Sequence, residues 1–115
     1  MAIIRPIPRK LLIHEVEYRE YLGSGRNGET WAEDKDMISL KHVRIEPSSE
    51  VKRTAYGDER QLHGILFIDH RNSNPNIKPK EKSKVYFNGQ EHFVNKVDVI
   101  YGLGNTPHHY EVELI

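Results

Sequence analysis

Apolar and polar residues alternate along several short stretches of this chain, which is the pattern of half-buried β-strands. In residues 11–22, apolar side chains such as Val16 take one parity and charged side chains such as Glu17 take the other. A helical period also fits this stretch, but its β-branched and aromatic residues favour a strand. Residues 37–47 form a second alternating stretch, which Pro47 ends.

The strongest local signal is a β-hairpin in residues 84–101. Two runs of β-branched and aromatic residues are joined by Asn88-Gly89, a pair that favours the two-residue turns of hairpins. In the second run one parity is apolar except for the polar Asn95, and its members are Phe93, Val97, Val99 and Tyr101. We therefore expect Phe87 and Phe93 to point into the core.

Two further runs complete the strand set. Residues 64–70 (GILFIDH) contain a short continuous apolar run, as in a strand that is covered on both faces. At the C-terminus, Tyr110, Val112 and Leu114 share one face of a last strand.

The connectors are rich in glycine, proline and charge. Residues 23–30 (GSGRNGET) predict a turn or an open loop, and residues 71–83 a polar linker. Residues 47–63 show no period, so we expect a long inserted loop, with a short helix as the alternative. Two prolines in residues 1–10 favour an extended N-terminal arm.

These elements predict an all-β protein, a small antiparallel β-barrel or sandwich of about six strands. A length of 115 residues is typical of one domain, here residues 1–115.

Composition narrows the choice of partners. Lys and Arg number 17, Asp and Glu also number 17, and a net charge of zero gives no global attraction to nucleic acid. A hydrophobic fraction of only 37% suggests that neighbouring subunits complete part of the surface.

The chain has no cysteine, which excludes disulfides and thiolate sites and fits a reducing cytoplasm. We recognise neither a signal peptide nor a membrane-spanning run, and we expect a soluble protein.

The seven histidines invite a metal site, but their spacing argues against one. On a strand, His63 and His70 would point to opposite faces, and the adjacent His108 and His109 would diverge. No HExxH motif or cysteine ligand is available. We expect no metal and no cofactor.

Candidate catalytic groups are equally sparse. The acidic run at Glu33, Asp34 and Asp36 lacks the glycine and terminal glutamate of a calcium loop and predicts a solvated turn. Asp69, at the end of an apolar run, is the acid best placed for a perturbed pKa, and Arg71 is its expected structural partner. No GxSxG motif is present, and GSGRNG matches the dinucleotide-binding pattern without its βαβ unit. We expect no enzymatic activity.

Single-stranded nucleic-acid binding by a barrel similar to the oligonucleotide-binding fold is the alternative function. It would use aromatic strands and the basic groups of two segments: Lys52, Arg53, Lys78, Lys80, Lys82 and Lys84. Glu81 interrupts the longer segment, and the zero net charge weighs against a basic groove.

Three phrases of the sequence resemble the minor capsid proteins of long-tailed bacteriophages and prophages of Gram-positive bacteria. They are IPRKLLIHEVEYREY, LKHVRIEPSSE and the C-terminal KVYFNGQEHFVNKVDVIYG with HHYEVELI. The layout is also similar to that of head-completion (stopper) proteins, small barrels with a long inserted loop that form a ring beneath the portal and adaptor.

The resemblance implies a non-enzymatic virion protein that joins head to tail. Its implied partners are further copies of itself in a ring, portal or adaptor proteins and tail-completion proteins, with no membrane. It would be found in the virion, and in the host cytoplasm during assembly.

The loop after Pro47 would be the assembly or channel loop. Its candidate residues are Lys52, Arg53, Tyr56, Asp58 and Arg60. Its cations would either contact packaged DNA non-specifically or pair with nearby carboxylates, and we favour the pairing.

Overall fold

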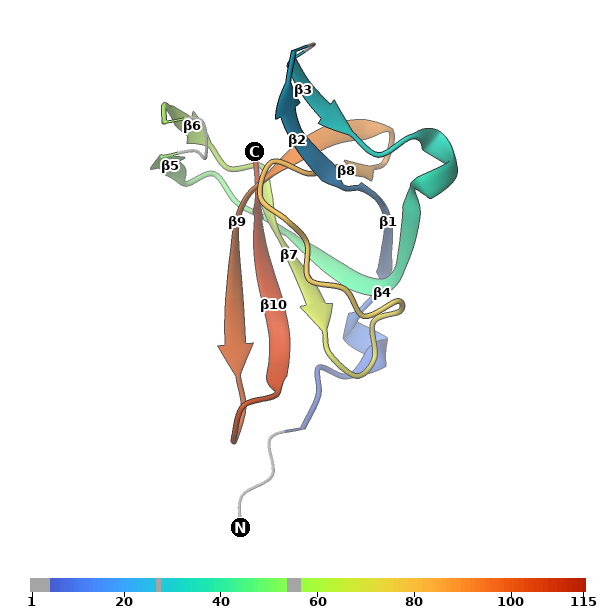
Figure 1. The fold of residues 1–115 in the computed structure, drawn as a ribbon. Coiled ribbons are helices and arrows are strands. Elements are labelled where there is room, and N and C mark those ends of the chain that lie inside the picture. Colours follow the sequence, from blue (N-terminus) through green and yellow to red (C-terminus); the bar gives the residue numbers. More distant parts are fainter. Residues whose placement is uncertain (1–4, 27, 54–56) are drawn as a thin grey trace.

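The computed structural model describes residues 5–26, 28–53 and 57–115. Six strands close into an antiparallel barrel in the order β1-β4-β7-β10-β9-β8 (Figure 1). Their bounds are β1 His14–Arg19, β4 Ile38–Pro47, β7 Gly64–Asp69, β8 Lys84–Phe87, β9 Gln90–Tyr101 and β10 Pro107–Leu114. The predicted all-β class is confirmed, and the barrel is the form it takes.

Two small hairpins and two short helices make up the other regular elements of the described residues. The hairpins are β2 Tyr21–Gly25 with β3 Gly28–Trp31, and β5 Val51–Arg53 with β6 Glu59–Gln61. The 3₁₀-helices are η1 Arg9–Leu11 and η2 Asp34–Asp36.

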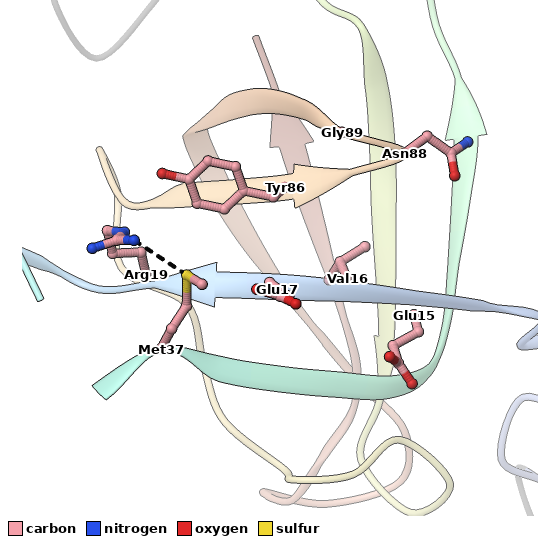
Figure 2. A pocket seen from close by; sticks show the side chains of 8 residues that line it. All are labelled: Glu15, Val16, Glu17, Arg19, Met37, Tyr86, Asn88 and Gly89. Carbon is pink, nitrogen blue, oxygen red and sulfur yellow. Dashed lines mark hydrogen bonds between the residues drawn. The ribbon is translucent and has the colours of Figure 1, made fainter. Parts of the chain in front are cut away.

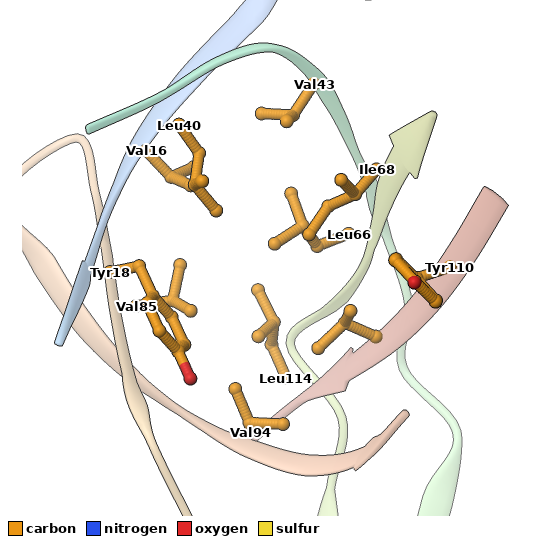
Figure 3. Packing of buried hydrophobic residues seen from close by; sticks show 11 residues of the cluster. Val16, Tyr18, Leu40, Val43, Leu66, Ile68, Val85, Val94, Tyr110 and Leu114 are labelled. Atoms are coloured by element: carbon orange, nitrogen blue, oxygen red, sulfur yellow. The ribbon is translucent and has the colours of Figure 1, made fainter. Parts of the chain in front are cut away.

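Alternation along the strands fills the barrel with apolar side chains (Figure 3). Val16 and Tyr18 of β1 point inward, as do Tyr110, Val112 and Leu114 of β10, so both predicted parities are confirmed there. The remaining members of the core cluster are Leu40, Val43, Leu66, Ile68, Val85 and Val94.

The β8–β9 hairpin is confirmed, because Asn88 (φ 52°) and Gly89 (φ 76°) both adopt the positive φ of a type I′ turn. The expected orientation of Phe93 is wrong. Val94 is fully buried, and the register with β10 skips Asn95, so a bulge there reverses the parity of β9. Beyond it, Val97 and Val99 pack against the core. Asn95 donates to the Glu113 carboxylate at 3.0 Å, which gives this buried amide a partner.

Residues 23–30 are not an open loop, because most of them belong to the β2–β3 hairpin. The chain leaves the barrel after β1, so Leu22 is 58% exposed although it shares the parity of buried Tyr18. Trp31 fixes the hairpin to the barrel by donating from its indole nitrogen to the Lys82 carbonyl at 2.8 Å. Its ring also contacts Tyr21 and Phe93, with centroids 5.6 and 6.1 Å apart.

The described part of residues 47–63 holds the β5–β6 hairpin and no helix, so the helical alternative is wrong there. Leu62, 1% exposed, buries the base of this hairpin, and its amide donates to the Glu50 carbonyl at 2.7 Å. Figure 1 shows β2–β3 and β5–β6 leaving the same end of the barrel, which we call the hairpin end. The N-terminal segment and the β9–β10 turn lie at the other, the arm end.

Candidate functional site

The hairpin end presents apolar side chains to solvent. Leu22 of β2 is 58% exposed and Val51 of β5 is 64% exposed. Leu22 and Val51 lie on separate two-stranded hairpins. In each hairpin the two strands pair with each other to form a sheet of their own, so the outer edges of that sheet are open. Exposed apolar groups on strand edges are typical of surfaces that another chain covers.

The sequence-predicted site residues fall on the β5–β6 hairpin. Lys52 and Arg53 lie in β5 and are opposite Arg60 and Glu59 of β6 in the strand register. Tyr56 lies outside the described residues. Asp58 and Arg60 form an ion pair at 3.2 Å, so Arg60 pairs within the hairpin as we favoured. The role of these residues in assembly stays a prediction.

A histidine pair lies at the base of this hairpin. The Nδ1 atoms of His63 and His92 are 3.1 Å apart, beside a shallow cavity of about 470 Å³ that includes Pro47 and Gln61. Burial lowers the pKa of His92, and the neighbouring His63 lowers it further. The close contact requires at least one neutral imidazole, because two cations at this distance repel each other.

A second groove, of about 460 Å³, runs along the outside of β1 and β8 (Figure 2). Glu15, Glu17 and Tyr86 line it, together with Arg19, which forms an ion pair with Asp34. Burial raises the pKa of Tyr86, as does its hydrogen bond to Glu91.

The histidines do not assemble a metal site. Over residues 5–26, 28–53 and 57–115, no three His, Asp or Glu side chains form a group that could hold a metal ion. The predicted divergence of His108 and His109 is wrong, because a register shift after Pro107 brings their Nδ1 atoms to 2.7 Å. His70 and His63 have separate partners, Asn76 and His92.

The candidate acids have structural partners. Asp34 pairs with Arg19 at the short helix η2. Asp69, fully buried, accepts hydrogen bonds from the backbone amides of Ile7, Arg71 and Asn72 at 2.8–3.0 Å. Arg71 is therefore a partner of Asp69 through its backbone amide. The hydrogen bond from the Ile7 amide to Asp69 holds the N-terminal segment at the end of β7.

An aromatic and basic cluster on the outside of the barrel was missed at the sequence level. Lys84 Nζ lies 4.1 Å from the centroid of Trp31 and forms an ion pair with Glu91, while Lys82 pairs with Glu29. The cluster exists because the bulge at Asn95 turns Phe93 outward, and no local pattern signals that turn.

No helix in the described part of the chain is long and apolar enough to cross a membrane. A closed barrel that carries two small hairpins with exposed apolar side chains has features typical of proteins that assemble with other chains. The chain belongs to the minor capsid protein family, whose model matches residues 8–114. It is therefore a phage structural protein of the virion, and the resemblance read from the sequence is confirmed at this level. Comparison with curated proteins and with solved structures finds no match.

Proposed function

We propose that this protein is a ring subunit at the joint between the phage head and tail, where it connects the portal region to the tail. The observation that carries the proposal is the hairpin end, where two hairpins project from a closed barrel and expose Leu22 and Val51. Covering such residues with a neighbouring chain removes apolar surface from water and favours association.

The arm end supports contacts on a second side. Leu11, Ile13, Tyr101 and Leu103 are 46–66% exposed there. Different apolar surfaces at two ends of one subunit suit heterologous contacts, which close into rings or connect successive layers of an assembly. Balanced charges let the carboxylates of one subunit meet the cations of the next.

Within this proposal the β5–β6 hairpin contacts neighbouring subunits or portal-side proteins. Lys52, Arg53, Tyr56, Asp58 and Arg60 would form that contact, and the hairpin would reach its final conformation on assembly. Its small size supports this view, since β5 and β6 are three residues each and, among residues 48–51 and 57–63, Leu62 alone is buried.

Electron microscopy of particles tests the proposal. Phage that lack this protein should yield DNA-filled or leaking heads separated from tails, and Val51→Asp with Leu22→Asp should reproduce the defect. Lys80→Asp places the same carboxylate on an exposed linker residue that does not line the pocket beside Leu22, and it should leave joining intact. Normally joined particles without the protein would refute the proposal.

The alternative, a barrel that binds single-stranded nucleic acid, is favoured by one observation, the outer cluster of Tyr21, Trp31 and Phe93 beside Lys84. These rings already pack on one another, which leaves less of each face for a base. Binding of a single strand that weakens steeply with salt, and that Trp31→Ala abolishes, would support this function.

A further inference from the structure

Four segments at the arm end contain no acidic residue. They are residues 5–11 (RPIPRKL), 41–44 (KHVR), 70–76 (HRNSNPN) and 107–109 (PHH). Together they hold six of the 17 Lys and Arg residues, four of the seven histidines and none of the 17 Asp and Glu residues. Although the net charge of the chain is zero, its charges are therefore distributed unevenly, with cations and no acids in these four segments.

Hydrogen bonds hold the four segments against one another. The Arg5 carbonyl lies 2.6 Å from His108 Nε2, and the Ile7 carbonyl accepts from the Asn72 amide group at 2.8 Å. Lys41 and Asn74 exchange two backbone bonds, at 2.8 and 3.0 Å. Arg44 donates to the Leu11 carbonyl at 3.0 Å, which adds the helix η1 to the same end.

The cations at this end are exposed and lack carboxylate partners. Within the described residues, no ion pair is formed by Arg5, Arg9, Lys10, Lys41 or Arg71, and all five are exposed. Arg44 is the exception, since it pairs with Glu46. Three acids lie beside these segments. Glu15 is opposite Lys41 in the strand register and forms no ion pair with it, Glu111 pairs with His109, and the buried Asp69 accepts from backbone amides. By contrast Arg60 of the hairpin end, for which DNA contact was the less favoured alternative, is paired with Asp58.

We infer that five exposed cations of the arm end bind the phosphate backbone of double-stranded DNA. They are Arg5, Arg9, Lys10, Lys41 and Arg71. An array of cations on separate segments matches the repeated charges of a polyanion better than one small anion. Membership of a capsid family places the protein in a particle that encloses nucleic acid. The inference goes beyond the proposed joint, because it concerns a second ligand, duplex DNA, and the charged rather than the apolar side chains of the arm end.

Fluorescence anisotropy of the purified full chain with a labelled duplex of about 20 base pairs tests this inference, from about 25 to about 200 mM salt. The variant Arg9→Gln/Lys10→Gln/Arg71→Gln should weaken binding at least about tenfold at low salt and reduce the salt slope by about 3. The matched control Lys35→Gln/Lys78→Gln/Lys96→Gln removes the same charge elsewhere and should lose less than about threefold. Thermal unfolding checks that both variants are folded.

Several results would overturn the inference. They are no binding at low salt, an equal loss in the control variant, and tighter binding of a single strand than of the duplex. Poly-glutamate that competes as well as duplex at equal charge would point to an acidic protein partner instead. Failure of the head–tail proposal is seen separately, in particle micrographs, so the two ideas can fail independently.

Discussion

The hydroxyl of Tyr18 links the barrel core to the polar linker, and its removal gives a sharp test of the fold. Tyr18 is 2% exposed, and its hydroxyl lies 3.0 Å from the hydroxyl of the fully buried Ser83. It also accepts from the Lys80 backbone amide at 2.9 Å, while Ser83 Oγ accepts from the Tyr21 amide at 3.0 Å. The substitution Tyr18→Phe keeps the ring and removes only the shared oxygen.

The expected cost is about 2 kcal/mol in the free energy of unfolding, within a range of about 1–3, because the part-buried Lys80 amide loses its partner and the buried Ser83 hydroxyl loses one of its two. For a chain of this size, that corresponds to a melting temperature lower by about 8 °C. The matched control is Tyr101→Phe, since Tyr101 is 57% exposed, and it should change stability by less than about 0.5 kcal/mol. Urea unfolding at neutral pH measures both.

Alkaline pH gives a second, independent signature of the same hydroxyl. Burial raises the pKa of Tyr18 above its ordinary value of 10.0. Above about pH 10 the unfolded chain therefore releases a proton that the folded protein keeps, so stability is full below that pH and falls as pH rises. Tyr18→Phe should lose less stability over this interval than the parent protein does. A variant as stable as the parent at neutral pH, with an unchanged alkaline loss, would refute the reasoning.

Three further substitutions test the pH response, the backbone and the core. Burial lowers the pKa of His92 below its ordinary value of 6.5, so the unfolded chain binds a proton at a higher pH than the folded protein does. The free energy of unfolding is therefore full above about pH 6.5 and decreases as pH falls. His92→Leu should reduce this decrease, measured by urea unfolding at about pH 7 and about pH 5. Gly64→Ala places a Cβ 2.9 Å from the Glu46 carbonyl oxygen and should cost about 1–3 kcal/mol, whereas Gly25→Ala meets open space and should be nearly neutral in thermal melts. Leu66→Ala empties a fully buried site and should cost about 2–5 kcal/mol by the same melts; a smaller loss would mean that the core relaxes around it.

Local signals predicted the parts of the fold that depend on neighbouring residues. Asn88-Gly89 specifies its turn alone, and the last strand alternates without interruption. The bulge at Asn95 could not be predicted, because it depends on Glu113, eighteen residues away, which supplies the partner that makes a buried amide tolerable. That one residue reverses a parity and moves Phe93 from the expected core to the outer surface.

The candidate site was predictable only as a region. The absence of any period in residues 47–63 marked them as an insertion, but strands of three residues carry too little pattern to be recognised. The concentration of cations at the arm end could not be predicted from the sequence, for a different reason. Its four acid-free segments lie far apart along the chain, and the acids elsewhere cancel their charge in every global count.

The two ends of the barrel should act independently. The molecule measures 53 Å along its longest axis, and a core of eleven buried side chains separates the hairpins from the basic segments. Substitutions this far apart with no shared partner add in free energy. Val51→Asp should therefore block head–tail joining and leave duplex binding unchanged, while Arg9→Gln/Lys10→Gln/Arg71→Gln should weaken duplex binding in the same way with or without Val51→Asp. A change in duplex affinity on Val51→Asp, in protein that melts normally, would mean that the barrel transmits an effect from one end to the other and that the two surfaces form one site.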